Sequence, residues 1–399
     1  MSRLAELIAQ LCPDGVEYRP LSELVGIRNG CDYKTLSPGN VPVYGSGGVM
    51  THVSEALGEG PTVLIPRKGS LDNIFFVEGE FWTVDTIFYT EIASDLDPKF
   101  FYYKMKTMRL SQMNEAAGVP SMNQRKLGRI QIPVPPLEVQ REIVRILDQF
   151  TTLEAELEAE LEARRTQYEH YRNHLLSMTA LKQRCGEIPV RKLGEVGVFH
   201  GGLTGKTKAD FSDSPDASAF VTYKEIYSRI EIDSIPVGRV QVADKEKQLA
   251  LQYGDVLFTG SSENSEEVGM TAVVTSEFSE RVYLNSFSIC FRWSEELFDP
   301  GYAKHMFNSP EIRREIQRCA SGVTRFNLSK KRMEKISVPV PPLEVQHEIM
   351  RVLDDFDALV NDISSGLPAE IAARRAQYEH YRDRLLSFPG KRVSDKEAS

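Results

Sequence analysis

The chain has 399 residues, a formal net charge of −9 and a hydrophobic fraction of 41%, enough for two or three domains that each bury a core. It contains no apolar run that could span a bilayer, and its start has no basic stretch leading into an apolar one, so we expect neither a membrane segment nor a signal peptide. The five cysteines are scattered and never spaced as CxxC. That pattern favours the reducing cytoplasm over a disulfide framework or a zinc site.

Residues 1–135 are predicted to form a first mixed α/β globule. Short runs rich in β-branched and aromatic residues, such as PTVLIP at 61–66 and DTIFYTEI at 85–92, alternate with glycine, serine, asparagine and aspartate. This pattern is typical of strands joined by turns. Near the end of the globule, residues 99–129 carry seven lysines and arginines against one acid, Glu115, which gives a local charge of +6.

A long helix is predicted next, within residues 136–182. Proline suits the first turn of a helix, and after Pro135 and Pro136 apolar residues recur every three or four positions among Glu, Arg and Gln. This spacing is typical of a coiled-coil helix. From Leu137 to Met178 the helix would include 42 residues and extend roughly 63 Å.

Residues 183–340 are predicted to form a second globule, and residues 341–390 a second long helix. Residues 301–335 hold nine lysines and arginines against three acids, again a charge of +6. Because proline removes a helix hydrogen bond and clashes with the preceding turn, we expect a kink or break near residues 364–368, where Gly366 and Pro368 lie. Residues 391–399 are expected to be a disordered tail.

The two halves of the chain are copies of one unit. Residues 132–150 match residues 338–356 at 14 of 19 positions, and residues 164–178 match residues 374–388 at 11 of 15. Self-similarity over half a chain indicates duplicated domains. We therefore predict an α+β fold with a pseudo-twofold duplication: two mixed α/β globules separated by two long helices that form an antiparallel coiled coil. Its predicted core residues are Leu147, Phe150, Leu157, Tyr168, Tyr171, Leu353, Phe356, Tyr378 and Tyr381.

Three features of this pattern resemble the specificity subunit of type I restriction–modification enzymes. They are the order globule–helix–globule–helix, the motif P-x-P-P-L-E-x-Q-x-x-I at the start of each long helix, and the G-V-x-x-x-N-x-x-K/R segment before it. The resemblance covers residues 10–388. VLIPRKGS at 63–70 and VLFTGSS at 256–262 also resemble parts of that family's target recognition domains.

The resemblance implies that each globule docks on double-stranded DNA and reads one half of an asymmetric bipartite sequence. It also implies that the helices set the spacing and bind two modification (methyltransferase) subunits, which hold S-adenosylmethionine and methylate adenine. Separate restriction subunits, the translocase and nuclease, would use ATP and Mg. This chain itself is expected to be non-catalytic and cytoplasmic, and to bind no cofactor, metal or membrane.

Arginine and lysine can bridge guanine O6 and N7, and asparagine and glutamine can bridge adenine N6 and N7, so polar residues on the predicted loops are candidate DNA contacts. In the first globule the candidates are Lys34, Tyr44, Ser46, Arg67, Lys68, Ser70, Asn123, Gln124 and Arg125. In the second globule they are Thr204, Lys206, Tyr223, Lys224, Thr259, Ser261, Ser262, Arg325, Asn327, Ser329 and Lys330. For each residue alone, an ordinary exposed turn position is an equally good interpretation.

Two other classes of protein stay open. A coiled-coil adaptor whose globules bind proteins would explain the helices and the net charge of −9, but not the paired basic segments. A self-sufficient nuclease or methyltransferase is disfavoured because the chain has no G-x-x-x-x-G-K-[ST] phosphate loop, and because Val and Leu flank each Pro-Pro where an adenine methyltransferase needs polar and aromatic residues.

Overall fold

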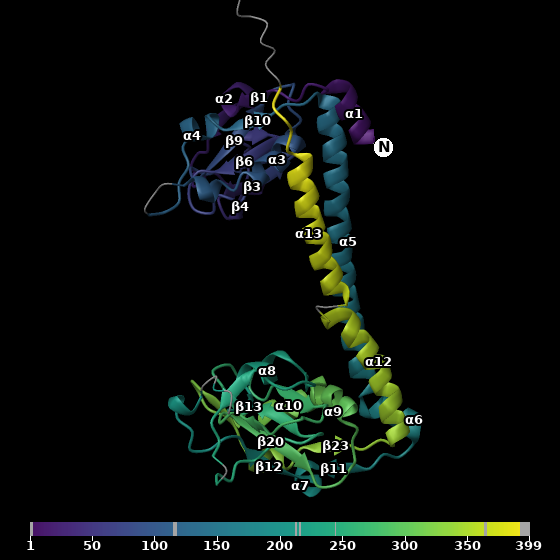
Figure 1. The fold of residues 1–399 in the computed structure, drawn as a ribbon. Coiled ribbons are helices and arrows are strands. Elements are labelled where there is room, and N and C mark those ends of the chain that lie inside the picture. Colours follow the sequence, from purple (N-terminus) through teal and green to yellow (C-terminus); the bar gives the residue numbers. More distant parts are fainter. Residues whose placement is uncertain are drawn as a thin grey trace, which may run out of the picture. The chain divides into compact units, whose positions relative to one another are not determined.

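The computed structural model describes residues 3–114, 118–211, 214, 217–243, 245–362 and 365–391. The chain forms two compact units, each built from two separate stretches of long helix and one globule (Figure 1). The first unit runs to Glu158 and resumes at Glu370, and the second unit is Ala159–Ala369. The segment boundaries expected along the sequence stay a prediction, because each unit takes residues from several of those segments.

The globule of the first unit is built on two four-stranded sheets, ordered β2-β9-β6-β7 and β4-β3-β8-β5, and a two-stranded sheet β1-β10. The strands expected from PTVLIP and DTIFYTEI are present as β6 and β9. The elements are α1 (Arg3–Leu11), β1 (Tyr18–Pro20), α2 (Leu21–Leu24), β2 (Val25–Asn29), β3 (Pro38–Gly45), β4 (Gly48–Val53), β5 (Gly58–Glu59), β6 (Thr62–Pro66), β7 (Phe75–Val77), β8 (Glu80–Thr83), β9 (Ile87–Ile92), α3 (Pro98–Thr107), the 3₁₀ helix η1 (Leu110–Met113), α4 (Gln124–Gly128) and β10 (Gln131–Pro133).

The globule of the second unit repeats this plan with a larger main sheet, ordered β12-β20-β16-β18-β14. Smaller sheets are β15-β13-β19, β17-β22-β21 and β11-β23. The elements are α6 (Met178–Cys185), β11 (Val190–Lys192), α7 (Leu193–Val196), β12 (Gly197–Gly201), the 3₁₀ helix η2 (Lys208–Asp210), β13 (Ser218–Val221), α8 (Tyr223–Ser228), β14 (Glu231–Ile232), β15 (Gly238–Val240), β16 (Val256–Thr259), β17 (Ser261–Ser262), β18 (Thr271–Val274), β19 (Val282–Leu284), β20 (Ser288–Trp293), α9 (Pro300–Phe307), α10 (Pro310–Arg318), β21 (Ala320–Ser321), β22 (Phe326–Leu328), α11 (Lys330–Met333) and β23 (Ser337–Pro339).

The registers of the two main sheets correspond strand by strand, which confirms the duplication at the level of structure. In the first unit β6 pairs with β9 so that Ile65 faces Phe88, and in the second unit β16 pairs with β20 so that Phe258 faces Ile289. The two-stranded sheets β1-β10 and β11-β23 have the same antiparallel arrangement. The mixed α/β globules predicted from the sequence are therefore present in both halves.

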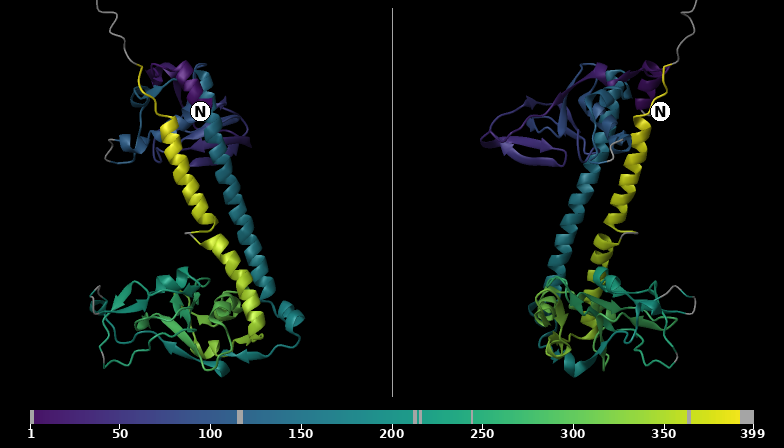
Figure 2. Two further views of the ribbon diagram at one scale, coloured as in Figure 1. Left: turned by 45° about the vertical axis from the view of Figure 1, so that its right-hand side comes forward. Right: turned by 90° about the vertical axis from the view of Figure 1, so that its left-hand side faces the viewer.

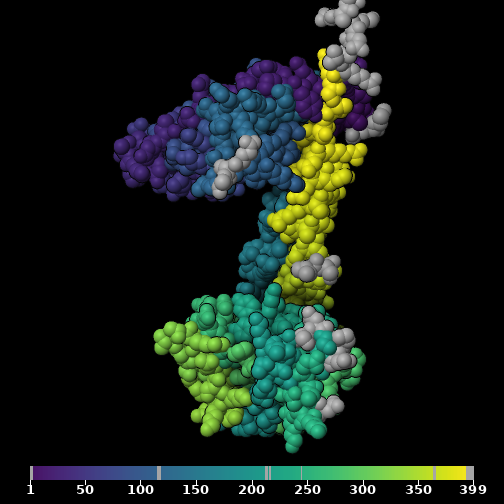
Figure 3. Space-filling view, turned by 60° about the vertical axis from the view of Figure 1, so that its left-hand side comes forward, coloured from purple at the N-terminus to yellow at the C-terminus, as the bar shows by residue number. Residues whose placement is uncertain are grey.

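The C-terminal segment of the chain closes the first unit. Val16 donates its backbone N–H to Pro389 O at 2.9 Å, and Lys391 donates its own to Val16 O at 3.0 Å. Leu386 and Phe388 are buried in the same core as Leu4. In the space-filling view the C-terminal helix, in yellow, lies directly against the first globule, in purple and blue (Figure 3). Of the tail expected to be disordered, only Lys391 belongs to the described residues.

Helix α5 (Leu137–Leu175) is continuous over 39 residues. It ends three residues before Met178 because the Ser177 side chain accepts a hydrogen bond from Ala180 N and thereby caps the next helix, α6. Within the expected segment 136–182 the long helix therefore ends at Leu175, and a separate short helix follows.

In the first unit, α13 (Leu367–Leu385) packs antiparallel to the N-terminal part of α5 (Figures 1 and 2). Phe150 lies between Tyr378 and Tyr381, with ring centroids 6.2 and 5.7 Å away. One turn further along α5, Arg375 bonds Glu154 at 2.5 Å and also pairs with Glu158. Residue numbers rise along one helix as they fall along the other, as an antiparallel pair requires.

The second unit repeats this contact with α12 (Leu343–Asn361) and the C-terminal part of α5. Phe356 lies between Tyr168 and Tyr171, with centroids 6.5 and 5.3 Å away. The predicted core positions Leu147 and Leu353 are fully buried and Leu157 is half-buried. Tyr171 and Tyr381 are wrong as core positions, because they are 39% and 40% exposed and stack at the edge of each aromatic group.

The break expected near residues 364–368 is confirmed, since α12 ends at Asn361 and α13 begins at Leu367. Only glycine fits at 366, because a Cβ there would come within 2.5 Å of Ala358 O. Pro368 occupies the first turn of α13, where its missing N–H costs nothing. Between the matching blocks the second copy is four residues longer than the first. Helices α12 and α13 have 19 residues each, against 39 in α5, so the additional length lies at the break.

One buried glutamine in each unit fastens the long helix to its globule. Gln140 Oε1 accepts from Asp97 N at 2.7 Å, and its Nε2 donates to Asp95 O at 2.9 Å and to Pro135 O at 2.7 Å. Gln346 makes the equivalent three bonds to Asp299 N, Leu297 O and Pro341 O, at 2.9, 2.9 and 2.8 Å. Each aspartate is also the N-cap of the next helix, α3 or α9.

Replacing Gln140 by methionine should lower the free energy of unfolding of the first unit by about 2–4 kcal/mol. The substitution keeps the volume of the side chain but removes the partner of one buried and two half-buried backbone groups. Urea denaturation of the purified chain measures the effect, with Gln149→Met, an exposed position on the same helix, as the matched control. Equal urea midpoints for the two variants would contradict this role for Gln140.

Candidate nucleic-acid interface

In the first unit, polar side chains from three elements meet at one end of the main sheet. Asn29 at the end of β2, Arg67 just after β6 and Gln124 at the start of α4 line a hollow of about 480 Å³. Gln124 Nε2 donates to Ile27 O at 3.1 Å and lies 3.4 Å from Asn29 Oδ1. The Arg67 guanidinium lies 5.8 Å from the centroid of the Phe88 ring, which restricts its orientation.

A surface loop flanks this hollow. Lys68 pairs with Ser121 in an antiparallel bridge, Gly69 N donates to Pro120 O at 3.0 Å, and Met122 N donates to Arg67 O at 2.8 Å. Beside them Val119 is 70% exposed. Asn123 caps α4 by accepting from Lys126 N at 2.8 Å, and Arg125 is exposed. The structure therefore brings together five of the nine predicted contacts of the first globule: Arg67, Lys68, Asn123, Gln124 and Arg125.

The other four candidates of this globule lie elsewhere on its loops. Lys34 is exposed and its ammonium is 4.0 Å from Asp32. Tyr44 is half-buried on β3 against Phe75, with ring centroids 5.8 Å apart, which gives it a packing role. Ser46 and Ser70 lie on turns that Asn73 joins, through a side-chain bond to Ser46 O and a backbone bond to Ser70 O.

In the second unit, the equivalent sheet end carries the short sheet β17-β22-β21. Ser261 and Ser262 of β17 pair with Asn327 and Phe326 of β22. Arg325 Nη2 donates to Ser261 Oγ at 3.2 Å, and its guanidinium lies 5.6 Å from the centroid of the Phe287 ring. Ser329 and Lys330, at the start of α11, are half-buried beside this sheet.

Two candidates of the second globule are wrong because their side chains are already used inside the protein. Lys206 is 4% exposed at its side chain and donates to Glu246 Oε1 at 2.6 Å, a bond that lowers the pKa of Glu246 to about 2. Thr259 is fully buried, and its hydroxyl accepts from Met270 N at 2.8 Å.

Three further candidates of the second globule are distant in sequence from Arg325 and the residues of the sheet β17-β22-β21. Thr204 is exposed and its backbone is bound on both sides by the Gln248 amide. Tyr223 and Lys224 begin α8, where Tyr223 is half-buried and Lys224 exposed. These three stay predictions without a geometric argument for a shared site.

The two basic segments do not act as continuous surfaces, because the fold uses several of their charges. Lys99 pairs with Asp148 at 3.0 Å, and Lys104 donates to Leu386 O at 3.1 Å. In the second unit the buried Lys304 pairs with Glu231 and Asp354 at 3.0 and 2.9 Å. Glu115, the one acid of the first segment, lies outside the described residues. Of the bases that remain exposed, Arg125 and Arg325 lie at the sheet ends, whereas Lys106, Arg314 and Arg318 lie elsewhere.

Asp148 and Asp354 occupy equivalent positions on α5 and α12 but have different partners. Tyr103 donates to Asp148 at 2.6 Å, whereas His305 Nε2 lies 2.8 Å from Asp354. Burial disfavours the charge on Asp354, but hydrogen bonds from His305 and Lys304 outweigh it, so the pKa of Asp354 lies below its ordinary value of 3.8. These contacts fix α9 against α12.

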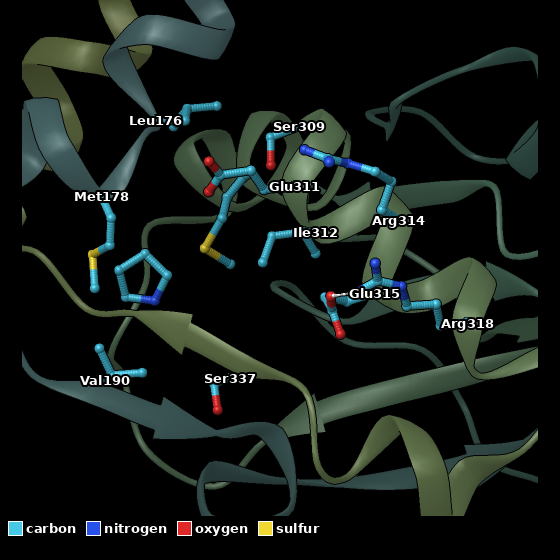
Figure 4. A pocket seen from close by; sticks show the side chains of 12 residues that line it. Leu176, Met178, Val190, Ser309, Glu311, Ile312, Arg314, Glu315, Arg318 and Ser337 are labelled. Atoms are coloured by element: carbon cyan, nitrogen blue, oxygen red, sulfur yellow. Dashed lines mark hydrogen bonds and ion pairs between the residues drawn. The ribbon is translucent and has the colours of Figure 1, made fainter.

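A hollow of about 320 Å³ lies beside α10, away from these residues (Figure 4). Apolar side chains, including Leu176, Met178 and Ile312, line it together with Glu315, which accepts from Arg318 at 2.5 Å. None of the predicted DNA contacts lines it. Within the described ranges, no three His, Cys, Asp or Glu side chains are grouped as ligands for a metal ion.

Among the helices of the described residues, none combines the length and apolar character needed to cross a membrane.

Comparison with known families decides the class of this chain. A model described as the type I restriction modification DNA specificity domain matches residues 13–163 and again residues 186–373. The chain belongs to this specificity family. The two matches correspond to the two copies found in the sequence, and they do not favour an unrelated coiled-coil adaptor.

Relatives and solved structures agree with this assignment. A Haemophilus influenzae protein assigned as a type I restriction enzyme specificity subunit is 29% identical over 94% of this chain and 96% of its own length. The Escherichia coli EcoR124I/EcoR124II specificity subunit is 32% identical over 73% of this chain and 71% of its own length. The fold is similar to that of a chain in a structure of type I restriction–modification assembly, with a TM-score of 0.62, 16% identity and coverage of 94% and 98%.

Sequence reasoning about this family member missed three side chains at the sheet ends: Asn29, Phe287 and Val323. Phe287 and Val323 are 62% and 91% exposed. The signal for Val323 was present, because Gly-Val stands at the start of both copies of the segment, at 118–119 and 322–323. Nothing local marks Phe287, which is recognised only through its contact with Arg325.

Replacing Asp354 by asparagine should destabilise the second unit at pH 7 by about 1 kcal/mol, since the carboxylate is partly exposed and water screens its ion pairs. Because the folded-state pKa is lowered, this stabilisation is present above about pH 4 and is lost as pH falls through the folded pKa. Thermal melting should show a lower melting temperature for the variant than for the native chain at pH 7. Below pH 4 the difference between the two melting temperatures should be smaller. Asp355→Asn, exposed on the same helix, should melt like the native chain at both pH values.

Proposed function

We propose that this chain recognises double-stranded DNA, each globule reading one half of an asymmetric bipartite site through the loops at the end of its main sheet. The observation that carries the proposal is that polar side chains lie at equivalent sheet ends of the two units: Arg, Lys, Asn and Gln in the first, and Arg, Asn, Ser and a half-buried Lys in the second. These are the side chains whose geometry matches base edges in the major groove. Family membership supports the same function.

The two half-sites should differ because the two sheet ends differ. The first presents an amide next to an arginine, Gln124 and Arg67, whereas the second presents Arg325 between Phe287 and Ser261. Amides suit adenine and guanidinium groups suit guanine. The framework that holds these loops is the same in both units, so the difference lies in the side chains.

We place the partner subunits on the long helices. Large apolar side chains remain exposed on α5, α12 and α13: Leu153, Tyr171, Leu343, Val352, Leu359 and Tyr381, each at least 36% exposed. Clustered exposed apolar residues mark protein interaction sites. Two methyltransferase subunits would dock there with S-adenosylmethionine, and restriction subunits would join them with ATP and Mg. The chain itself would position these enzymes without catalysing a step.

A complex of this chain with its methyltransferase subunits should protect two separate half-sites on one duplex. Its affinity should fall steeply between 50 and 200 mM salt, since phosphate contacts release counterions. Selection from a randomised duplex pool followed by footprinting measures both properties. Equal binding to every sequence in the pool would remove the proposal.

Four residues inserted into LEAELEAELEA, residues 153–163 of α5, should lengthen the preferred gap between the half-sites. One additional helical turn adds about 6 Å. The half-sites should not change, because the insertion is remote from both sheet ends. Four residues inserted instead after Lys391 serve as a control of equal length. An unchanged gap preference in the α5 variant would contradict the spacer role.

A further inference from the structure

We infer that Arg325 is the guanine-reading residue of the second globule, held in a reading geometry by Phe287 and Ser261. This inference rests on the proposed function and assigns one base contact within it. The guanidinium lies 5.6 Å from the Phe287 ring centroid, and Nη2 donates to Ser261 Oγ at 3.2 Å. A planar guanidinium stacked on an aromatic ring loses less freedom when it forms a bidentate pair.

The two residues that hold Arg325 are themselves fixed. Phe287 donates its N–H to Oδ1 of the buried Asn285 at 3.0 Å and accepts at its carbonyl from Gly260 N at 2.9 Å. Ser261 belongs to β17 and pairs with Asn327. The Asn327 side chain donates to Arg325 O at 3.4 Å. Arg325 is therefore held at its backbone carbonyl by Asn327 and at its guanidinium by Ser261 and Phe287.

The guanidinium N–H groups of Arg325 remain available for a ligand. Of five N–H donors on a guanidinium, one is bound to Ser261. In the described part of the chain Arg325 forms no ion pair, whereas other arginines of this unit do: Arg292 pairs with Asp255 at 2.6 Å and Arg318 with Glu315 at 2.5 Å. An uncompensated, oriented guanidinium matches the O6 and N7 acceptors of guanine.

The surroundings of Arg325 favour a base over a phosphate. Phe287 lies beside the guanidinium, and Val323 belongs to the same loop as Arg325; they are 62% and 91% exposed. Apolar side chains form no favourable contact with a hydrated phosphate. They can contact the edge of a base pair or a thymine methyl group in the groove. Exposed apolar residues beside a free cation at a sheet end are explained by such a contact.

The first globule has no counterpart of Arg325. Ser121 pairs with Lys68 as Asn327 pairs with Ser261, so Ser121 corresponds to Asn327 in the structure. The shared motif had instead aligned Asn327 with Asn123. Ser121 stands three positions after Gly118 and Asn327 stands five positions after Gly322, and Arg325 lies in the longer loop. A Cβ at Gly322 would lie 1.9 Å from Arg325 O, so glycine permits the tight closure of that loop. The loop that carries Arg325 is thus specific to the second globule, whereas the first globule presents Arg67 from the end of β6, over the Phe88 ring.

The test uses the native chain in complex with its methyltransferase subunits and a randomised duplex pool. Arg325→Ala should remove the preference for guanine at one position of one half-site, by between about 5- and 150-fold, and leave the other half-site unchanged. Phe287→Ala keeps every donor and should weaken the same preference by less. Arg318→Ala, the same change at an ion-paired arginine of this unit, should preserve both half-sites.

A chemical substitution in the DNA makes the test specific for the guanine edge. Replacing that guanine by 7-deazaguanine removes the N7 acceptor, so it should weaken binding by the native complex and have no effect on the Arg325→Ala complex. A uniform loss of affinity across all sequences in Arg325→Ala would mean a phosphate contact and would overturn the inference, as would two unchanged half-sites. Failure of the native complex to select any bipartite sequence would instead overturn the proposed function.

Discussion

The fold depends on one buried amide in each half of the chain. Gln140 and Gln346 each bond three backbone groups, one buried and two half-buried: one N–H at the cap of α3 or α9 and two carbonyls, of which the buried one comes from the proline segment before the long helix. Because an unpaired buried amide or carbonyl is costly, no apolar residue can replace glutamine there without loss. This constraint explains why PPLEVQ appears twice without change while the surrounding globules have diverged.

A fixed junction between globule and helix allows the loops at the far end of the sheet to vary. The main sheets keep equivalent registers in the two units, yet the residues at their ends differ: Asn29, Arg67 and Gln124 in one unit, and Ser261, Phe287 and Arg325 in the other. Loops on a rigid scaffold can change side chains without disturbing the core. Two different binding surfaces on one repeated framework are the expected result.

The helices and their break could be predicted because hydrophobic periodicity, Gly366 and Pro368 affect only the backbone within a few residues. The duplication could be predicted because two segments of the chain match directly. Local signals were not enough for side chains whose role depends on distant partners. Lys206 resembles an exposed loop lysine, but its ammonium is paired with the carboxylate of Glu246, forty residues away. Thr259 resembles a strand-end residue with a free hydroxyl, but that hydroxyl accepts a hydrogen bond from Met270 N. Arg325 gains its orientation from Phe287, and the C-terminal segment gains its place from Val16.

The same long-range pairing resolves the conflict between a net charge of −9 and binding to DNA. Each basic segment appeared to carry +6, but Lys99, Lys104 and Lys304 hold helices and the chain terminus in place. What remains near the sheet ends is a small number of oriented donors. Coulombic attraction from a broad basic surface would bind any sequence equally, whereas a few stacked or hydrogen-bonded guanidinium and amide groups bind only where base edges match them. A protein whose task is to discriminate between sequences is served by that distribution of charge.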